Sequence, residues 1–115
     1  MEISYKSKKA EKQFSPKYAK KWTYPEPIKQ KLLAMETFIR KATSLKDIAN
    51  YKPYHLHQLH GERQTEWSLY VGNTGYRVTI LPCDEEWHLI QSQKVLEICH
   101  TIKKLKITEV SHHYE

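Results

Sequence analysis

Residues 66–81 have the sequence E-W-S-L-Y-V-G-N-T-G-Y-R-V-T-I-L, and this stretch decides the fold. Apolar and polar side chains alternate on both sides of residues 72–75, which is the period of a half-buried β-strand. The glycines between the two runs supply the positive φ angles that a tight hairpin turn requires. The stretch therefore predicts a β-hairpin with strands over 66–71 and 76–81, the second ending at Pro82.

The same alternation predicts which side chains point away from the core. Arg77 lies on the face opposite Val78 and Ile80, so a strand would hold its guanidinium rigidly on an exposed surface. A guanidinium in that position is suited to bind phosphate through two parallel N–H bonds, and it stays charged at any relevant pH. The alternative is an ion pair with Glu66 or Glu109, because arginines on strands often pair across the sheet.

The N-terminal half has helical periodicity instead. Ser15 and Pro16 form a typical helix start, and aromatic residues recur every fourth position around it at Phe14, Tyr18 and Trp22. After Pro25 and Pro27, the apolar residues follow the spacing of an amphipathic helix that packs on the sheet: Ile28, Leu32, Met35, Ile39 and Ala42. Further strands are expected at 3–6 and 102–110, with a partly packed excursion over 83–101. These elements predict one α+β domain over residues 1–115.

Composition narrows the class of protein. No run of 18 apolar residues is present, so we expect no membrane span, and the N-terminus lacks the apolar segment of a signal peptide. Cys83 and Cys99 have no CxxC spacing, so we expect reduced thiols, a cytoplasmic protein and no cofactor.

Positive charge is concentrated in the first half of the chain. Residues 1–52 hold 13 Lys and Arg against 5 Asp and Glu, whereas residues 53–115 hold 6 against 8. Such a basic half suits a polyanionic partner such as nucleic acid, a ribosome or an acidic protein. A helical face solvated by lysines is the alternative.

Histidines gather around the predicted sheet. His55, His57 and His60 form an H-x-H-x-x-H pattern, and the chain ends H-H-Y-E with His113 and Tyr114. The pattern matches no established zinc spacing, so we expect no metal site, although zinc ligation is an alternative. Imidazole exchanges protons near neutral pH, which suits general acid–base catalysis, and a tyrosine ring can stack on a base. Unspecialised surface histidines and a disordered tail are the structural alternatives.

These residues resemble a known family. The segments 56–63, 66–68, 75–80 and 109–115 are similar to those of the RelE/ParE toxin superfamily, and most of all to its HigB-like "killer protein" branch. The resemblance implies a helical hairpin packed on a twisted antiparallel sheet that includes the C-terminal strand. It also implies a toxin that enters the ribosomal A site and cleaves mRNA there without a metal, by attack of the ribose 2′-OH on the adjacent phosphate.

Site residues carry over from the resemblance position by position. Arg63 and Arg77 match the phosphate-stabilising basic residues of the family, and His113 and Tyr114 match its C-terminal catalytic pair. His57 or His60 would be the opposite proton carrier, with Arg63, Arg77 and Tyr114 contacting RNA. His60 stands where related toxins often have lysine, and H-H-Y-E departs from the D-Y-H of some HigB toxins.

The sequence thus predicts a ribosome-dependent mRNA endonuclease. A ParE-like inhibitor that blocks DNA gyrase without catalysis is the alternative, and a basic co-repressor on DNA is a third possibility. The expected partners are mRNA in the ribosomal A site, a cognate helix-turn-helix antitoxin of the HigA type, and operator DNA bound by the toxin–antitoxin complex.

Overall fold

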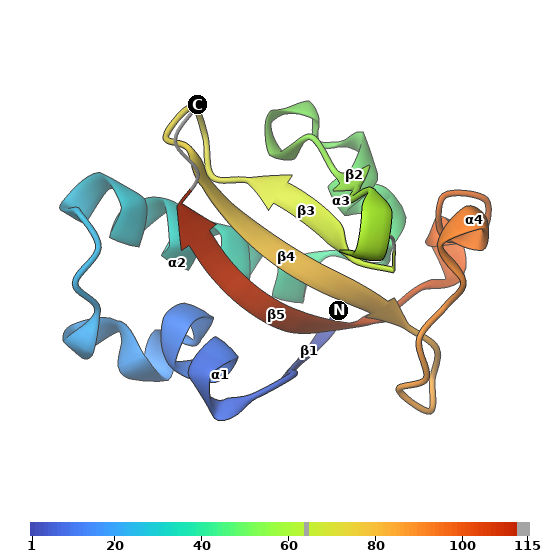
Figure 1. The fold of residues 1–115 in the computed structure, drawn as a ribbon, viewed down its shortest axis with the longest axis horizontal. Coiled ribbons are helices and arrows are strands. Elements are labelled where there is room, and N and C mark those ends of the chain that lie inside the picture. Colours follow the sequence, from blue (N-terminus) through green and yellow to red (C-terminus); the bar gives the residue numbers. More distant parts are fainter. Residues whose placement is uncertain (64, 113–115) are drawn as a thin grey trace.

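The computed structural model describes residues 1–63 and 65–112, and these form an α+β fold (Figure 1). Five strands and the helices α1–α4 are joined by short 3₁₀ helices, labelled η. Their order along the chain is β1 (Glu2–Tyr5), α1 (Lys8–Phe14), η1 (Pro16–Lys21), α2 (Glu26–Lys41), α3 (Leu45–Asn50), η2 (Lys52–Tyr54), β2 (His57–Gln58), η3 (Gly61–Arg63), β3 (Trp67–Tyr70), β4 (Tyr76–Cys83), α4 (Ser92–Val95), η4 (Cys99–Thr101) and β5 (Lys104–His112).

The strands form one sheet in the order β1-β5-β4-β3-β2. The predicted hairpin is present, with Leu69 opposite Val78 and Tyr70 opposite Arg77, and both Gly72 and Gly75 have positive φ. The expected purely antiparallel sheet is wrong in one respect, because β1 pairs with β5 in the parallel direction. A parallel pair needs a long crossover connection, and here almost the whole chain lies between the two strands.

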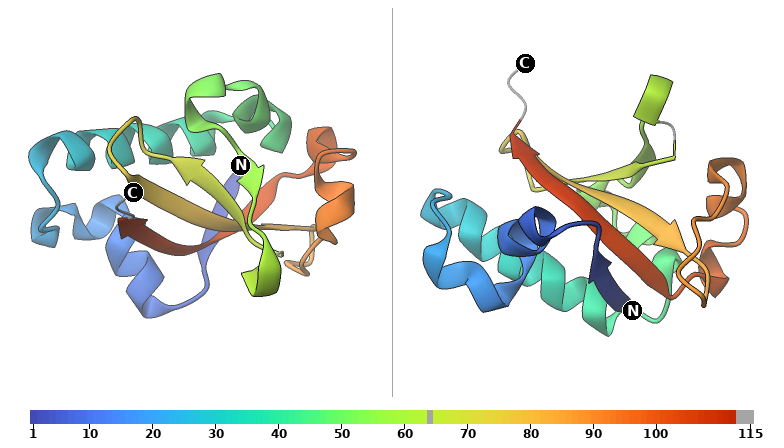
Figure 2. Two further views of the ribbon diagram at one scale, coloured as in Figure 1. Left: turned by 45° about the horizontal axis from the view of Figure 1, so that its top comes forward. Right: turned by 60° about the horizontal axis from the view of Figure 1, so that its bottom comes forward.

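One face of the sheet is covered by α2 (Figures 1 and 2). The predicted apolar stripe of this helix is confirmed, since Ile28, Leu32, Met35 and Ile39 are all buried. They belong to a single core that also takes in the inward side chains of β3, β4 and β5. Burying each such side chain contributes about 1.5–3 kcal/mol, so this contact fixes which face of every strand points inward.

The predicted first helical arm is interrupted. Ser15 has an extended backbone (φ −68°, ψ 131°) that ends α1, and its hydroxyl accepts a hydrogen bond from Lys17 N as η1 begins. Ser15 therefore separates two short helical segments, although Phe14 and Trp22 are both buried as their spacing predicted.

Pro82 does not end β4, contrary to the prediction. The strand continues to Cys83, and Pro82 pairs with Leu105 of β5. Its carbonyl accepts a hydrogen bond from Ile90 N on the opposite edge of β4, beyond the last pairing with β3. In an antiparallel strand the N–H and C=O of one residue point to the same side, so the missing proline N–H removes no bond to β5.

The excursion over 83–101 is partly packed, as expected. Val95 is fully buried and Ile98 contacts the core, whereas Leu96 is exposed. Cys83 and Cys99 are both free thiols. Within residues 1–63 and 65–112, no helix combines the length and apolar character that crossing a bilayer requires.

Candidate active site on the open face of the sheet

The face of the sheet opposite α2 is called the open face below. Its side chains come from β2 to β5 and are mostly polar. Successive cross-strand pairs place them in two rows: Tyr70, Arg77 and Ser111 in one row, and His57, Ser68, Thr79 and Glu109 in the next. The alternation of β4 thus puts Arg77 on this face, as the sequence predicted.

Tyr70 is the centre of a cluster of aromatic and basic side chains. The Arg77 guanidinium carbon lies 5.1 Å from the centre of the Tyr70 ring. The His55 ring stacks on Tyr70 at 5.0 Å with an interplanar angle of 19°, and the His57 ring meets Tyr70 edge-on at 5.2 Å. A proton-exchanging group and a permanent cation are therefore held beside one half-buried ring.

The backbone at His55 places its own ring and orients the ring of His57. His55 has a left-handed conformation (φ 45°, ψ 56°) at the end of η2, which is uncommon for a residue other than glycine. Its carbonyl accepts a hydrogen bond of 2.7 Å from His57 Nδ1. Because a carbonyl can only accept, the proton of a neutral His57 ring sits on Nδ1 and the lone pair sits on Nε2. His57 Nε2 is thus prepared to take a proton.

Arg63 is used differently from Arg77. Its Nε donates to Glu66 at 2.7 Å and its Nη2 donates to Glu109 at 2.6 Å, so it forms an ion pair with both carboxylates. Glu66 directly precedes β3 and Glu109 lies in β5, and β4 runs between these strands. The Arg63 guanidinium therefore crosses over β4, and η3 lies on the side of the sheet away from α2 (Figure 2).

This double ion pair changes the charge that the open face presents. The hydrogen bond and charge of Arg63 lower the pKa of Glu66. In turn, the carboxylates of Glu66 and Glu109 raise the pKa of Arg63 further above its ordinary value. Because two carboxylates already bind the Arg63 guanidinium, a phosphate would have to displace one of them to bind there. Arg63 binds both of the glutamates that were considered as partners for Arg77, whereas Arg77 lies beside the Tyr70 ring.

Of the remaining predicted site residues, the structure describes only His60, and it lies apart from the cluster. His60 is exposed and follows β2 at the end away from His55 and Tyr70. His113 and Tyr114 lie outside the described residues; Ser111, two residues before His113, is opposite Arg77. Among the described residues, no group of three or more His, Cys, Asp or Glu side chains is arranged to hold a metal ion.

Two members of the cluster were not predicted as site residues, His55 and Tyr70. The hairpin already contained the signal for Tyr70, because a four-residue turn over 72–75 leaves Tyr70 opposite Arg77. Nothing in the sequence pattern indicated the left-handed backbone of His55.

No protein-family model matches the chain, and no curated protein matches it. The functional assignment therefore depends on the residues of the open face.

The Arg63–Glu66 ion pair predicts a specific dependence of stability on pH. The pKa of Glu66 is lower in the folded than in the unfolded chain, so its contribution is present above the ordinary value of 4.5 and is lost as pH falls through the folded value. Arg63→Met should lower the free energy of unfolding on the order of 1 kcal/mol at pH 7, because the pair is partly exposed. Urea denaturation should show this difference shrinking between about pH 5 and pH 3. Lys103→Met, at an exposed lysine, is the control; a loss in Arg63→Met that is the same at pH 3 and pH 7 would contradict the ion pair.

Proposed function

We propose that this chain is the toxin of a type II toxin–antitoxin system, similar to the RelE/ParE superfamily, and that it cleaves mRNA on the ribosome. The observation that carries the proposal is the cluster of His57, Arg77 and Tyr70 on the open face. It combines a base with a free lone pair, a fixed cation and an aromatic ring, which are the groups that cleavage by an internal 2′-OH uses. The α+β architecture, with α2 on one face of the sheet and β5 as the last strand within it, also fits this family.

In the proposed reaction, His57 Nε2 takes the proton of the ribose 2′-OH as its oxygen attacks the adjacent phosphorus. The bond between phosphorus and the 5′-oxygen of the next nucleotide then breaks. A general acid protonates that oxygen, which leaves a 2′,3′-cyclic phosphate and a 5′-hydroxyl. We assign this acid to His113, with Tyr114 stacking on a base, because the resemblance matches these two residues to the C-terminal catalytic pair of the family.

Arg77 stabilises the charge that develops on the phosphate oxygens. Its place on a strand, beside Tyr70, provides the fixed geometry that such stabilisation needs. We assign Arg63 a positioning role, in which its ion pairs hold η3 across β4. This departs from the phosphate-binding role that the resemblance implied for Arg63.

The proposal includes the expected partners. A cytoplasmic helix-turn-helix antitoxin would neutralise the toxin, and the complex of the two would bind operator DNA. The basic N-terminal half suits the ribosome, since ribosomal RNA is a polyanion.

Two histidines with different surroundings give a matched test of the proton acceptor. His57→Asn should reduce cleavage of mRNA on purified ribosomes by about 10²–10⁴-fold, the range for loss of a general base. His60→Asn, the same substitution outside the cluster, should leave cleavage unchanged. Primer extension on the mRNA measures both. Equal loss in the two variants would contradict the assignment. If the wild-type protein leaves the mRNA intact but inhibits DNA supercoiling by gyrase, the results favour the gyrase inhibitor instead.

Two arginines give a matched test of phosphate stabilisation. Arg77→Lys keeps the positive charge but loses the planar pair of donors, so we expect cleavage to fall about 10²-fold or more in the same assay. Arg40→Lys makes the same change on α2, where Arg40 pairs with Glu36, and should have little effect on cleavage. Thermal unfolding of each variant checks that the fold is retained. Full activity in Arg77→Lys would show that a point charge suffices and that the bidentate role is wrong.

A further inference from the structure

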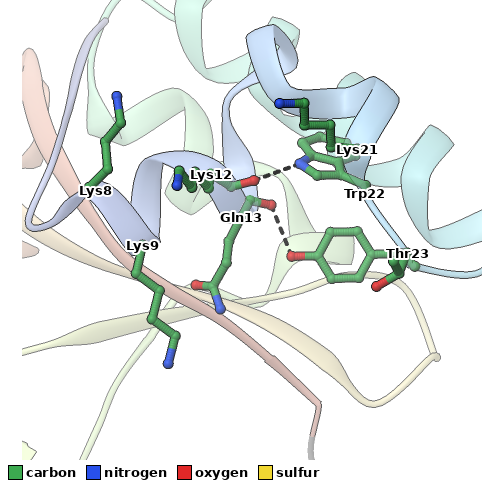
Figure 3. A pocket seen from close by; sticks show the side chains of 8 residues that line it. Lys8, Lys9, Lys12, Gln13, Lys21, Trp22 and Thr23 are labelled. Carbon is green, nitrogen blue, oxygen red and sulfur yellow. Dashed lines mark hydrogen bonds between the residues drawn. The ribbon is translucent and has the colours of Figure 1, made fainter.

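A second basic feature lies away from the open face, beside α1. A groove of about 560 Å³ separates α1 from the segment 21–24, and side chains of both line it (Figure 3). Lys8, Lys9 and Lys12 project from α1, and Lys21 belongs to the facing segment. The other lining residues are Gln13, Trp22, Thr23 and Tyr24.

The charge of this groove is largely uncompensated. Lys9, Lys12 and Lys21 are exposed, and the described residues offer them no ion pair. Only Lys8 is paired, with Glu11 at 3.0 Å, and no carboxylate lines the groove itself. Several ammonium groups around one depression attract anions and repel each other until an anion binds.

The floor of the groove is rigid. Trp22 Nε1 donates a hydrogen bond of 2.8 Å to the Lys12 carbonyl, and the Tyr24 hydroxyl donates one of 2.9 Å to the Gln13 carbonyl. Burial raises the pKa of Tyr24 to about 12, so the hydroxyl keeps its proton and remains a donor. Two aromatic rings therefore fix α1 to the segment that faces it, and the groove is present without a ligand to form it.

The groove is connected to the end of β5 that carries the candidate active site. β1 pairs with β5 only as far as Ile107, and α1 flanks the rest of that edge, where the Gln13 side chain accepts a hydrogen bond of 3.0 Å from Val110 N. Tyr24 contacts Tyr76 edge-on at 5.8 Å, and Tyr76 precedes Arg77 in β4. The groove therefore flanks the end of β5 at which Ser111 pairs with Arg77, although Arg77 points to the open face and Tyr76 to the opposite one.

We propose that this groove binds the phosphodiester backbone of single-stranded RNA, a few nucleotides from the phosphate held by Arg77. The inference rests on the proposed function, because it extends the path of the same substrate strand around the edge of β5. Lysines act as point charges toward phosphates and need no base sequence, so the contact would be independent of the codon being cut. An extended polyanion is favoured over an acidic protein because α1 flanks β5 at Val110, and the next residue, Ser111, pairs with Arg77, so one strand of RNA can follow the surface from the groove to the open face.

The test is binding of a fluorescent 2′-O-methyl oligoribonucleotide, which is not cleaved, measured by anisotropy over a range of salt concentrations. The variant Lys9→Gln/Lys12→Gln removes two unpaired lysines of the groove. Each lost phosphate contact lowers the slope of log K against log salt by about 0.7, so the slope should fall by about 1.4 and affinity by about tenfold at physiological salt. Lys46→Gln/Lys103→Gln removes two exposed lysines elsewhere and is the matched control.

Binding that weakens only in the groove variant supports the inference, and binding that weakens equally in both double variants overturns it. A poly-glutamate peptide is the second ligand to test. If it binds the wild-type protein as tightly as the oligonucleotide does, and if the groove variant no longer binds it, the RNA proposal is overturned in favour of an acidic protein. The proposed nuclease is judged separately on ribosomes. If the wild-type protein binds the oligonucleotide in the groove but cuts no mRNA, only the nuclease proposal is rejected. If the wild-type protein cuts mRNA and the groove variant binds the oligonucleotide as tightly as the wild type, only the proposal that the groove binds RNA is rejected.

Discussion

Burial of the apolar stripe of α2 against one face of the sheet is the constraint on which the rest of the structure depends. The residues of this stripe are buried, and they form one hydrophobic core with the inward side chains of β3, β4 and β5. A slip of one residue in β4 would exchange its two faces, placing Arg77 in that core and Val78 outside it. The penalty for burying an unpaired guanidinium makes such a slip prohibitive. Packing on one side therefore presents the reactive groups on the other.

The open face separates two arginines that the sequence could not tell apart. Arg63 is the last residue of η3, a 3₁₀ helix that begins at Gly61, and its side chain crosses β4 to reach Glu66 and Glu109. Arg77 is fixed within β4 beside Tyr70. Both are cations on the same face, but the first is offset by two carboxylates and organises the surface, whereas the second is in the cluster that contains His57.

The parts of the fold set by short-range patterns were predictable. Period-two alternation gave the hairpin and the face of Arg77, and the spacing of Ile28, Leu32, Met35 and Ile39 gave the buried side of α2. The failures involve long-range partners. β1 is parallel because it pairs with β5, about a hundred residues later in the chain. β4 continues through Pro82 because β3 no longer pairs with it there, so the missing proline N–H breaks no bond between strands.

The candidate site was predictable only as a set of residue types. The alternation placed Arg77, but the grouping of His57 with Tyr70, to the exclusion of His60, depends on how β2 pairs with β3, and no local pattern indicated the left-handed backbone of His55. The pairing of Arg63 with Glu109 joins residues 46 positions apart, and no local pattern indicates it. The role proposed for His113 and Tyr114 still depends on the resemblance alone, because these residues lie outside the described part of the chain.

The central claim is that the groups on the open face use the ribose 2′-OH to cleave RNA, and the chemistry of the substrate tests it most directly. Ribosomes programmed with an mRNA that carries a single 2′-deoxynucleotide immediately 5′ of the cleaved bond should yield no product at that position. The unmodified mRNA should yield a 2′,3′-cyclic phosphate and a 5′-hydroxyl. Cleavage that proceeds equally on the 2′-deoxy mRNA, or that leaves a 5′-phosphate, would contradict the claim.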